Sequence, residues 1–396
     1  MLRMKKILIL LLHLFNSIIP RNKNIWITGR ASKWEYNNDP PSFFDNSKYF
    51  YLYLHNHTNA KVYWLSTSCS EIELLKSFNL PVVKFPSVKG IYLTLRAKYF
   101  FHHYGPYQIS NILQMDSIQI NLWHGTPIKK IMYDVYGKPQ KDQTRMEKLT
   151  NNQDNVYMCS TSEYVSENIY QSAFDKRLDL FLNFGYPRLD VLKLNKKEST
   201  DFCIKYSPQL LRYINISKEK SRVFLYMPTF RDDDYDYLDK AKIPYKELDS
   251  KLADMNAVFF MKLHPLTKNK DISGYNNIVM IDNDVDIYPF LVFTDYLVTD
   301  YSSIFFDYLL FDKEIIFIPF DLDQFIDTRQ LYFPYNDITP GKKYYTFQDF
   351  VADLNEIDRI NFSVERNRIK NMFIQDYNYD ASEKIYEFFI SRSNQK

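Results

Sequence analysis

Short runs of β-branched and aromatic residues alternate with helical stretches along the whole chain of 396 residues, and this alternation restricts the fold more than any other feature. In the first half we expect strands at 24–28, 61–65, 81–85, 98–102, 118–123, 156–160 and 180–184. In the second half we expect them at 222–227, 257–263, 277–281, 296–299 and 314–318. Helical stretches separate many of these strands, at 46–54, 71–78, 88–95, 162–174, 244–255, 287–293 and 304–311. Strand–helix alternation in both halves predicts an α/β protein with parallel sheets covered by helices on both faces.

The polar, charged segment 195–220 separates the two halves and is the candidate linker. We therefore expect one domain at 24–205 and a second at 206–380, followed by a closing helix at 381–396. In open α/β sheets, ligands bind beyond the carboxyl ends of the strands. Two such domains facing each other would place the site in the cleft between them.

Charge and glycine content exclude two classes of site. Lys and Arg number 50 and Asp and Glu number 48, a net charge of +2, so we expect no nucleic-acid partner. The eight glycines never lie within five positions of one another. This spacing excludes the glycine-rich dinucleotide fingerprint and the Walker loop. A phosphate site in this chain must therefore use other donors.

Residues 1–23 form a basic and apolar N-terminal segment. Its apolar run at 7–15 is too short to span a bilayer, which needs about 20 residues. Two interpretations stay open: an interfacial helix whose basic residues meet anionic lipid, or a helix packed on the protein's own core. The three cysteines include no C-x-x-C pair, so we expect no disulfide framework, no zinc ribbon and a cytoplasmic location.

Reactive side chains follow directly after several of the expected strands. His124 comes after the strand at 118–123, and Gly125 beside it permits a tight turn. A histidine in such a strand-to-helix elbow can act as a general base near neutral pH. The alternative is a turn histidine that only bonds the backbone.

Two further strand ends in the second half offer groups that suit a phosphate. Lys262 and His264 end the strand at 257–263, and a period of two places them on the same side. Thr229 and Arg231 follow the strand at 222–227 and offer a hydroxyl group and a guanidinium group. We interpret the acidic run at 232–234 as a solvated loop rather than a metal site.

The segment Asp300-Tyr-Ser-Ser303 lies between an expected strand and an expected helix. A helix N-terminus presents free N–H groups and a partial positive charge. Together with the hydroxyl groups of Ser302 and Ser303, it forms an anion site that needs no glycine loop. Asp300 or Ser302 could instead cap the helix, and capping does not exclude phosphate binding.

These segments, taken together, resemble the CDP-glycerol glycerophosphotransferases, which build teichoic acids and related capsule polymers of the cell envelope. The matching segments are 122–130, 184–190, 225–232, 262–265, 298–303 and 332–341, and their order agrees over roughly 24–380. The family typically has Trp where this chain has Phe230. The resemblance implies a GT-B-like fold, with two Rossmann-type domains whose parallel sheets face each other across a cleft. It also implies that 24–205 is the acceptor side and 206–380 binds the CDP-linked donor.

The resemblance further implies the reaction: an acceptor hydroxyl attacks the β-phosphorus of a CDP-linked polyol, most simply CDP-glycerol, and CMP leaves. His124 is then the general base and His264 holds the diphosphate. The implied donor-binding residues are Thr229, Arg231, Lys262, Asp300, Ser302 and Ser303. The implied acceptor-side residues are Gly125, Thr126 and Arg188. The acceptor would be a lipid-linked saccharide or growing polymer at the cytoplasmic face of the membrane, with peripheral attachment, no cofactor and no metal. A GT-B glycosyltransferase that uses a nucleotide sugar, and a non-catalytic scaffold, are the competing hypotheses.

Overall fold

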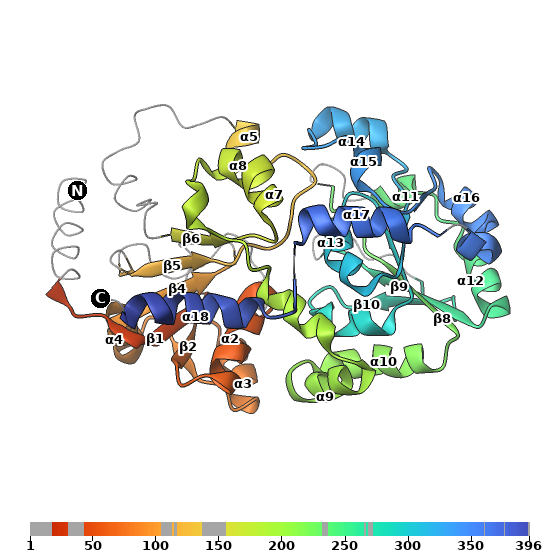
Figure 1. The fold of residues 1–396 in the computed structure, drawn as a ribbon. Helices are drawn as coiled ribbons and strands as arrows, with labels where there is room; N and C mark the ends of the chain where they lie inside the picture. Colours follow the sequence, from red (N-terminus) through yellow and green to blue (C-terminus); the bar gives the residue numbers. More distant parts are fainter. Residues whose placement is uncertain are drawn as a thin grey trace, which may run out of the picture. The chain divides into compact units, whose positions relative to one another are not determined.

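The computed structural model describes residues 18–30, 43–103, 113–114, 117–136, 156–231, 237–264, 267, 272–359, 361–375 and 377–394. Of the expected N-terminal segment, residues 1–17 lie outside this part. The chain forms two compact α/β units (Figure 1). The first contains the chain up to His124, then Tyr136–Val191 and the end from Tyr377, whereas the second contains Gly125–Val135 and Leu192–Asp376. The boundaries of these units differ from those at 205 and 380 that the sequence suggests.

The first unit is built on a seven-stranded parallel sheet with the order β3-β2-β1-β4-β5-β6-β7. Its strands are β1 (Asn22–Arg30), β2 (Lys61–Ser66), β3 (Val82–Lys84), β4 (Ala97–His102), β5 (Ile118–Asn121), β6 (Val156–Cys159) and β7 (Phe181–Leu182). Its helices include α2 (Asp45–His57), α3 (Cys69–Ser77), α4 (Val88–Arg96), α7 (Glu163–Val165), α8 (Gln171–Phe174) and α18 (Ala381–Asn394). The order reverses at β1, as in doubly wound sheets, where ligands bind at the carboxyl ends of the strands.

The second unit repeats this plan with a six-stranded parallel sheet in the order β10-β9-β8-β11-β12-β13. Its strands are β8 (Arg222–Tyr226), β9 (Ala257–Lys262), β10 (Ile278–Ile281), β11 (Tyr296–Thr299), β12 (Glu314–Phe317) and β13 (Lys342–Lys343). Its helices include α9 (Lys196–Tyr206), α10 (Leu211–Lys218), α11 (Tyr237–Lys240), α12 (Tyr245–Asp254), α13 (Ile304–Tyr308), α14 (Leu322–Thr328), α15 (Tyr335–Ile338), α16 (Phe347–Ala352) and α17 (Ser363–Phe373). The short helix α5 (Tyr133–Tyr136) begins in this unit, and its last residue belongs to the first.

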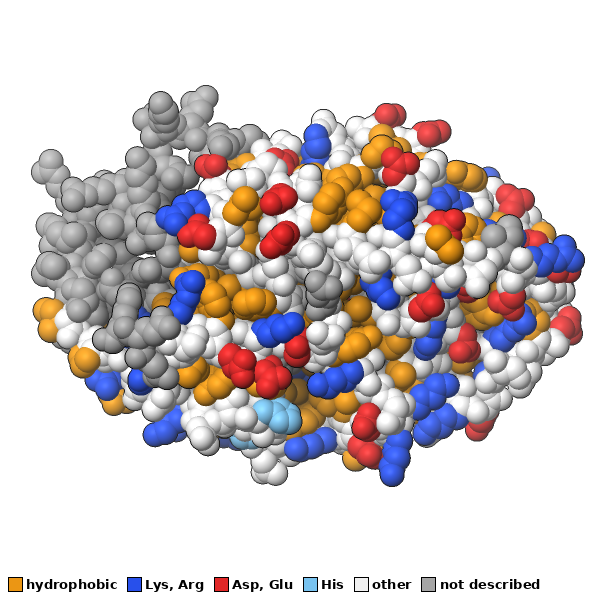
Figure 2. Space-filling model, viewed as in Figure 1, with side chains coloured by type: hydrophobic (Ala, Val, Ile, Leu, Met, Phe, Trp, Pro, Cys, Tyr) orange, Lys and Arg blue, Asp and Glu red, His pale blue; other side chains and the backbone are white. Residues whose placement is uncertain are grey.

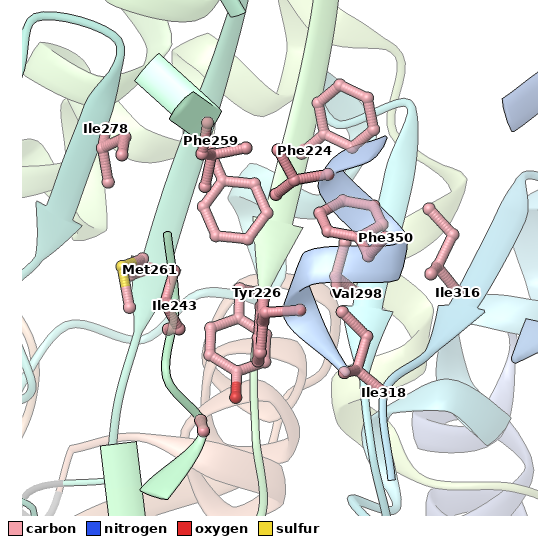
Figure 3. Packing of buried hydrophobic residues seen from close by; sticks show 14 of the residues in the cluster. Phe224, Tyr226, Ile243, Phe259, Met261, Ile278, Val298, Ile316, Ile318 and Phe350 are labelled. Carbon is pink, nitrogen blue, oxygen red and sulfur yellow. The ribbon is translucent and has the colours of Figure 1, made fainter. Parts of the chain in front are cut away.

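The core of the second unit fixes the ends of its central strands. Phe224, Phe259 and Val298 project from β8, β9 and β11 and pack with Phe350 of α16 (Figure 3). Every residue of β9 is buried, as expected for a parallel strand covered on both faces. Each fully buried side chain of this size contributes about 1.5–3 kcal/mol, so these strands form a rigid base for the loops at their carboxyl ends.

The segment 195–220 is not a linker, so this expectation was wrong. It forms α9, a 3₁₀ turn at Pro208–Leu210 and α10. Asn195 accepts from the backbone N–H of Glu198, and the Glu198 side chain accepts from the N–H of Asn195, a capping box that starts α9. The polar residues that suggested a linker lie mainly on the exposed helix faces, while Cys203 and Tyr213 are buried.

The expected helix at 287–293 is a 3₁₀ helix, Tyr288–Phe293, and β13 was not expected because it has only two residues. On the face drawn in Figure 2, acidic and basic side chains are interspersed, in keeping with the nearly balanced charge. Within the described ranges, the structure contains no helix long and apolar enough to span a membrane.

Candidate active site

The chain turns sharply just after β5, over the last residues of this part of the first unit and the first residue of the second. Trp123 has φ 55° and Gly125 has φ 133°, both in the left-handed region. The backbone N–H of Trp123 donates to Oδ1 of Asn121 at 2.9 Å, which fixes the start of the turn. The tight turn expected at Gly125 is therefore confirmed, and it places His124, half-buried, at the carboxyl end of the sheet.

The His124 imidazole has a defined tautomer. Its Nδ1 lies 3.1 Å from the backbone carbonyl oxygen of His103. A carbonyl only accepts hydrogen bonds, so Nδ1 carries a proton, and in the neutral imidazole the lone pair is on Nε2. The ring also packs on Trp123, with centroids 4.1 Å apart. Nδ1 thus bonds the backbone, as expected for a turn histidine, while Nε2 of the neutral ring has the lone pair that a general base requires.

Arg188 lies against this turn and is almost completely buried. Its Nη1 donates to the His124 carbonyl and to Oδ1 of Asp45, each at 2.8 Å. Burial by itself would raise the pKa of Asp45, but the adjacent Arg188 guanidinium, with smaller contributions from the His103 and His124 rings, outweighs it, so the pKa is lowered. Thr126, the other acceptor-side residue expected beside Gly125, is buried and belongs to the second unit.

Sequence reasoning missed Asp45 and Asn46. Asn46 is fully buried and donates from Nδ2 to the carbonyls of Leu122 and Trp123, at 3.2 and 2.8 Å. The only sequence signal was an Asp-Asn pair at the start of an expected helix. Such a pair is typical of ordinary N-terminal capping, so it could not be distinguished from a structural feature.

In the second unit, an ion-pair cluster joins the segments after β8 and β11. Arg231 Nη2 donates to Asp300 Oδ2 at 2.8 Å, and its Nε donates to Asp321 Oδ2 at 2.8 Å. Asp300 has no exposed surface and Arg231 is 8% exposed. Burial would lower the pKa of the guanidinium, but the two carboxylates more than compensate, so the pKa is raised. Arg231 stays charged and is fully engaged within the protein.

Thr229 and Tyr335 complete this cluster around Asp300. The backbone N–H of Thr229 donates to Asp300 Oδ1 at 2.8 Å, and the Tyr335 hydroxyl donates to the Asp300 carbonyl at 2.9 Å. The ring of Tyr301 packs on the guanidinium of Arg231, with Cζ 4.9 Å from the ring centroid. The structure therefore brings Thr229, Arg231 and Asp300 together, with Thr229 joined through its backbone N–H and carbonyl groups. Among the described residues, the buried Thr229 hydroxyl has no hydrogen-bond partner.

Ser302 and Ser303 follow this cluster and are half-buried at the start of α13. Ser303 stands at the N-cap without a side-chain capping bond, so the expected capping by Asp300 or Ser302 was wrong. Asp300 instead accepts from the N–H groups of Thr229 and Tyr301. Among the described residues, neither serine hydroxyl has a hydrogen-bond partner in the protein, and the N–H groups of 302–304 donate no hydrogen bond there.

Lys262 and His264, expected on one side of a strand end, lie in different environments. Lys262 is 8% exposed and its Nζ donates to the carbonyl of Asn283 at 2.7 Å. Burial lowers the pKa of Lys262 to about 8, although three nearby aspartates act in the opposite direction. His264 is exposed, and its ring stacks on Phe230 with centroids 4.5 Å apart. The ends of β8 and β9 are thus joined through these two rings.

The described part of the chain holds no group of three or more His, Cys, Asp or Glu side chains arranged to bind a metal. The acidic run at 232–234, for which a metal site was the alternative, lies outside the described residues.

Comparison with known proteins gives matches over nearly the whole chain. A family model described as CDP-Glycerol:Poly(glycerophosphate) glycerophosphotransferase matches residues 36–391. The chain is 30% identical over 329 residues to the teichoic acid glycerol-phosphate transferase of Staphylococcus aureus (strain NCTC 8325 / PS 47), covering 80% of this chain and 81% of that protein. It is 31% identical over 252 residues to the teichoic acid poly(glycerol phosphate) polymerase of Staphylococcus epidermidis, covering 61% of this chain. That match spans only 34% of the polymerase.

The wall teichoic acid polymerase TagF has the same fold, with a TM-score of 0.75 at 24% identity, covering 100% of this chain and 97% of that one. The expected GT-B-like class, with two parallel α/β sheets, is thereby confirmed. Since the family model covers residues 36–391 and the S. aureus transferase is 30% identical over most of both proteins, the chain belongs to the CDP-glycerol:poly(glycerophosphate) glycerophosphotransferase family.

Proposed function

We propose that the protein transfers glycerol phosphate from CDP-glycerol to a hydroxyl group of a lipid-linked saccharide or of a growing teichoic-acid or capsule polymer. Family membership and the relatives named as glycerol-phosphate transferase and polymerase support this reaction. The acceptor oxygen bonds to the β-phosphorus as the bond from that phosphorus to the bridging oxygen breaks. CMP leaves with the electron pair, and the acceptor hydroxyl loses its proton.

The observation that carries the proposal is the hydrogen bond from His124 Nδ1 to the carbonyl of His103. This bond leaves the lone pair of the neutral imidazole on Nε2, where it can take the proton of the acceptor hydroxyl. A positioned base of this kind typically contributes ~10²–10⁴-fold to the rate. The left-handed Trp123 and Gly125 project the imidazole from the carboxyl end of β5.

The start of α13 supplies the proposed contacts to the donor diphosphate. The hydroxyl groups of Ser302 and Ser303 and the N–H groups of 302–304 are donors without partners among the described residues. Phosphoryl transfer depends mainly on positioning and on neutralising oxygen charge, which such donors provide. Arg231 and Asp300 bond each other, so we assign them to holding this segment in place rather than to direct contact with the donor.

His264 is the proposed second contact to the diphosphate. Its imidazole is exposed while its orientation is fixed by stacking on Phe230, so it can donate to a phosphate oxygen. Lys262 is held by the Asn283 carbonyl and adds positive charge behind the strand end rather than a direct contact. The family resemblance implies that His124 and the donor segment act on one donor molecule.

The acceptor and the membrane surface belong to the same proposal. On α4, the apolar residues Val88, Ile91 and Tyr92 share one face, with Val88 89% and Tyr92 58% exposed. Lys84 and Lys89 beside them are also exposed. An exposed apolar face next to basic residues suits the surface of an anionic membrane. Attachment there would bring the protein to a lipid-linked acceptor at the cytoplasmic face.

Vesicle co-sedimentation tests this attachment with full-length protein and vesicles that contain or lack anionic lipid. Val88→Asp with Tyr92→Asp should reduce binding to anionic vesicles. Val364→Asp is the matched control, because Val364 is 77% exposed on α17 of the second unit. Equal binding of both variants would remove α4 from the proposal.

The reaction itself is tested by incubating purified protein with CDP-glycerol or CDP-ribitol, with and without a lipid-linked disaccharide. CMP is measured, and the product is identified by mass. We expect CMP that depends on both donor and acceptor, together with a product heavier by one or more glycerol phosphate units. A product formed only from a nucleotide sugar, as a glycoside, would replace this function with that of a glycosyltransferase.

A further inference from the structure

A buried polar cluster in the first unit holds the backbone on which His124 stands. Its members are Asp45 and Asn46 at the start of α2 and Arg188 in the 3₁₀ helix Pro187–Lys193. Asn46 has no exposed surface and the Arg188 side chain is 5% exposed. Buried polar groups require hydrogen-bond partners, so the partners of these side chains indicate what the cluster supports.

The cluster bonds three consecutive backbone carbonyls. Asn46 Nδ2 donates to the carbonyl of Leu122 at 3.2 Å and to that of Trp123 at 2.8 Å. Arg188 Nη1 donates to the carbonyl of His124 at 2.8 Å. These carbonyls lie just beyond the last residue of β5, where the ladder to the neighbouring strands ends. Side chains therefore replace the sheet as the support for this stretch of backbone.

The members of the cluster also fix one another. Asp45 Oδ1 accepts from Arg188 Nη1 at 2.8 Å and from the Asn46 N–H at 2.7 Å. Asn46 Oδ1 accepts from the backbone N–H of Arg188 at 3.0 Å. Asn46 and Arg188 lie 142 positions apart in the sequence. Both ends of the Asn46 amide and the shared nitrogen of Arg188 are thus in use.

The backbone that the cluster supports is strained. Trp123 has φ 55°, a left-handed conformation that costs a bulky residue about 1–3 kcal/mol. Such a conformation persists only where the surrounding structure enforces it. Here the carbonyls of Trp123 and of both its neighbours are bonded by the cluster. Without these bonds the turn would relax, and the residue that follows it would change direction.

We propose that Asn46 and Arg188, held in place by Asp45, are positioning residues that set the direction of the His124 imidazole for catalysis. This inference rests on the proposed role of His124 as the general base. A misplacement of about 1 Å at a reacting group can cost about 10²-fold in rate. Loss of the cluster should therefore lower kcat and leave the KM for CDP-glycerol unchanged.

Asn46→Asp is the sharpest variant, because it keeps the size of the side chain and turns the donor that faces two carbonyls into an acceptor. We expect kcat for CMP release to fall about 10²-fold, with unchanged KM for CDP-glycerol. Asn168→Asp is the matched control: Asn168 is exposed in the same unit and its Nδ2 donates to the Tyr164 carbonyl at 2.9 Å. This control should behave as the wild type.

A double-variant measurement separates positioning of His124 from a merely structural role. In the His124→Ala protein, Asn46→Asp should cause no further loss of the residual CMP release, because the group it positions is absent. A further loss of the same size would overturn the inference, as would a raised KM with unchanged kcat. If Asn46→Asp fails to fold, Arg188→Met and Arg188→Lys decide the matter by the same readouts, with Lys expected to retain more activity than Met.

The failure of this inference and the failure of the proposed function give different results. If His124→Ala releases CMP at the wild-type rate, the general-base role fails and the positioning role falls with it. If His124→Ala is inactive while Asn46→Asp and Arg188→Met keep the wild-type kcat, only the positioning role is wrong.

Discussion

Replacing Asp300 by alanine should destabilise the second unit, because it removes a fully buried carboxylate on which three donors converge. Asp300 accepts from Arg231 Nη2 and from the N–H groups of Thr229 and Tyr301. Breaking a buried ion pair from one side costs about 3–5 kcal/mol. Arg231 keeps Asp321, which accepts from Nε and Nη2 at 2.8 and 2.9 Å. We therefore expect a loss of about 3 kcal/mol, the lower part of that range.

The distribution of tryptophan makes this loss measurable by unit. Three of the four tryptophans, at positions 26, 64 and 123, lie in the described part of the first unit, and the fourth, at position 34, lies outside the described residues. Their fluorescence during urea unfolding reports on that unit, while hydrogen exchange of the β8, β9 and β11 amides reports on the second. A loss of about 3 kcal/mol corresponds to about 10²-fold faster exchange of these core amides. The tryptophan transition should not move.

Two controls frame this experiment. Asp300→Asn keeps an oxygen to accept from Thr229 but loses the charge opposite Arg231, so its effect should be smaller, about 1.5–3 kcal/mol. Asp179→Asn removes a carboxylate from an exposed ion pair with Arg177 and should leave both units unchanged. Unchanged exchange in Asp300→Ala, or an equal shift of the tryptophan transition, would refute the assigned role of the cluster.

Three further predictions follow from single sites. Burial lowers the pKa of His102 to about 3, so below about pH 6.5 the unfolded chain binds a proton at this residue that the folded chain does not bind. The stability of the first unit should therefore fall between about pH 6.5 and pH 3. His102→Phe should flatten this decline in urea unfolding followed by tryptophan fluorescence. Gly29→Ala should destabilise the same unit by about 1–3 kcal/mol or more. Gly29 has φ 119°, and a Cβ there would lie 2.1 Å from the Leu65 carbonyl oxygen. An unchanged thermal midpoint would contradict this prediction. Ser302→Ala with Ser303→Ala should raise the KM for CDP-glycerol. The thermal midpoint should not change, because neither hydroxyl group has a hydrogen-bond partner among the described residues. An unchanged KM would remove these serines from the donor site.

Local patterns in the sequence predicted the strands because burial and periodicity act over a few residues. β9 is buried at every position, and it was recognisable from the apolar run at 257–261. The elbow at His124 was predictable from Gly125 after such a run, and its left-handed φ agrees. By contrast, the segment 195–220 contains enough charge to suggest a linker, although the buried faces of α9 and α10 hold it against the second unit.

Long-range pairing is what the sequence did not reveal. Arg231, which the resemblance places among the donor-binding residues, pairs with Asp300 and Asp321, which lie 69 and 90 positions away. Asn46 bonds the backbone beside His124 from 76 and 77 positions away. Neither contact has a local signature, since an Asp or Asn at a helix start is also an ordinary capping residue.

The most direct test of the general-base assignment is the rate of CMP release by His124→Ala, measured beside its affinity for CDP-glycerol. The tautomer fixed by the His103 carbonyl predicts a fall in kcat of at least about 10²-fold with the affinity for CDP-glycerol retained. Acceptor-dependent CMP release at the wild-type rate, from a folded His124→Ala protein, would contradict the assignment.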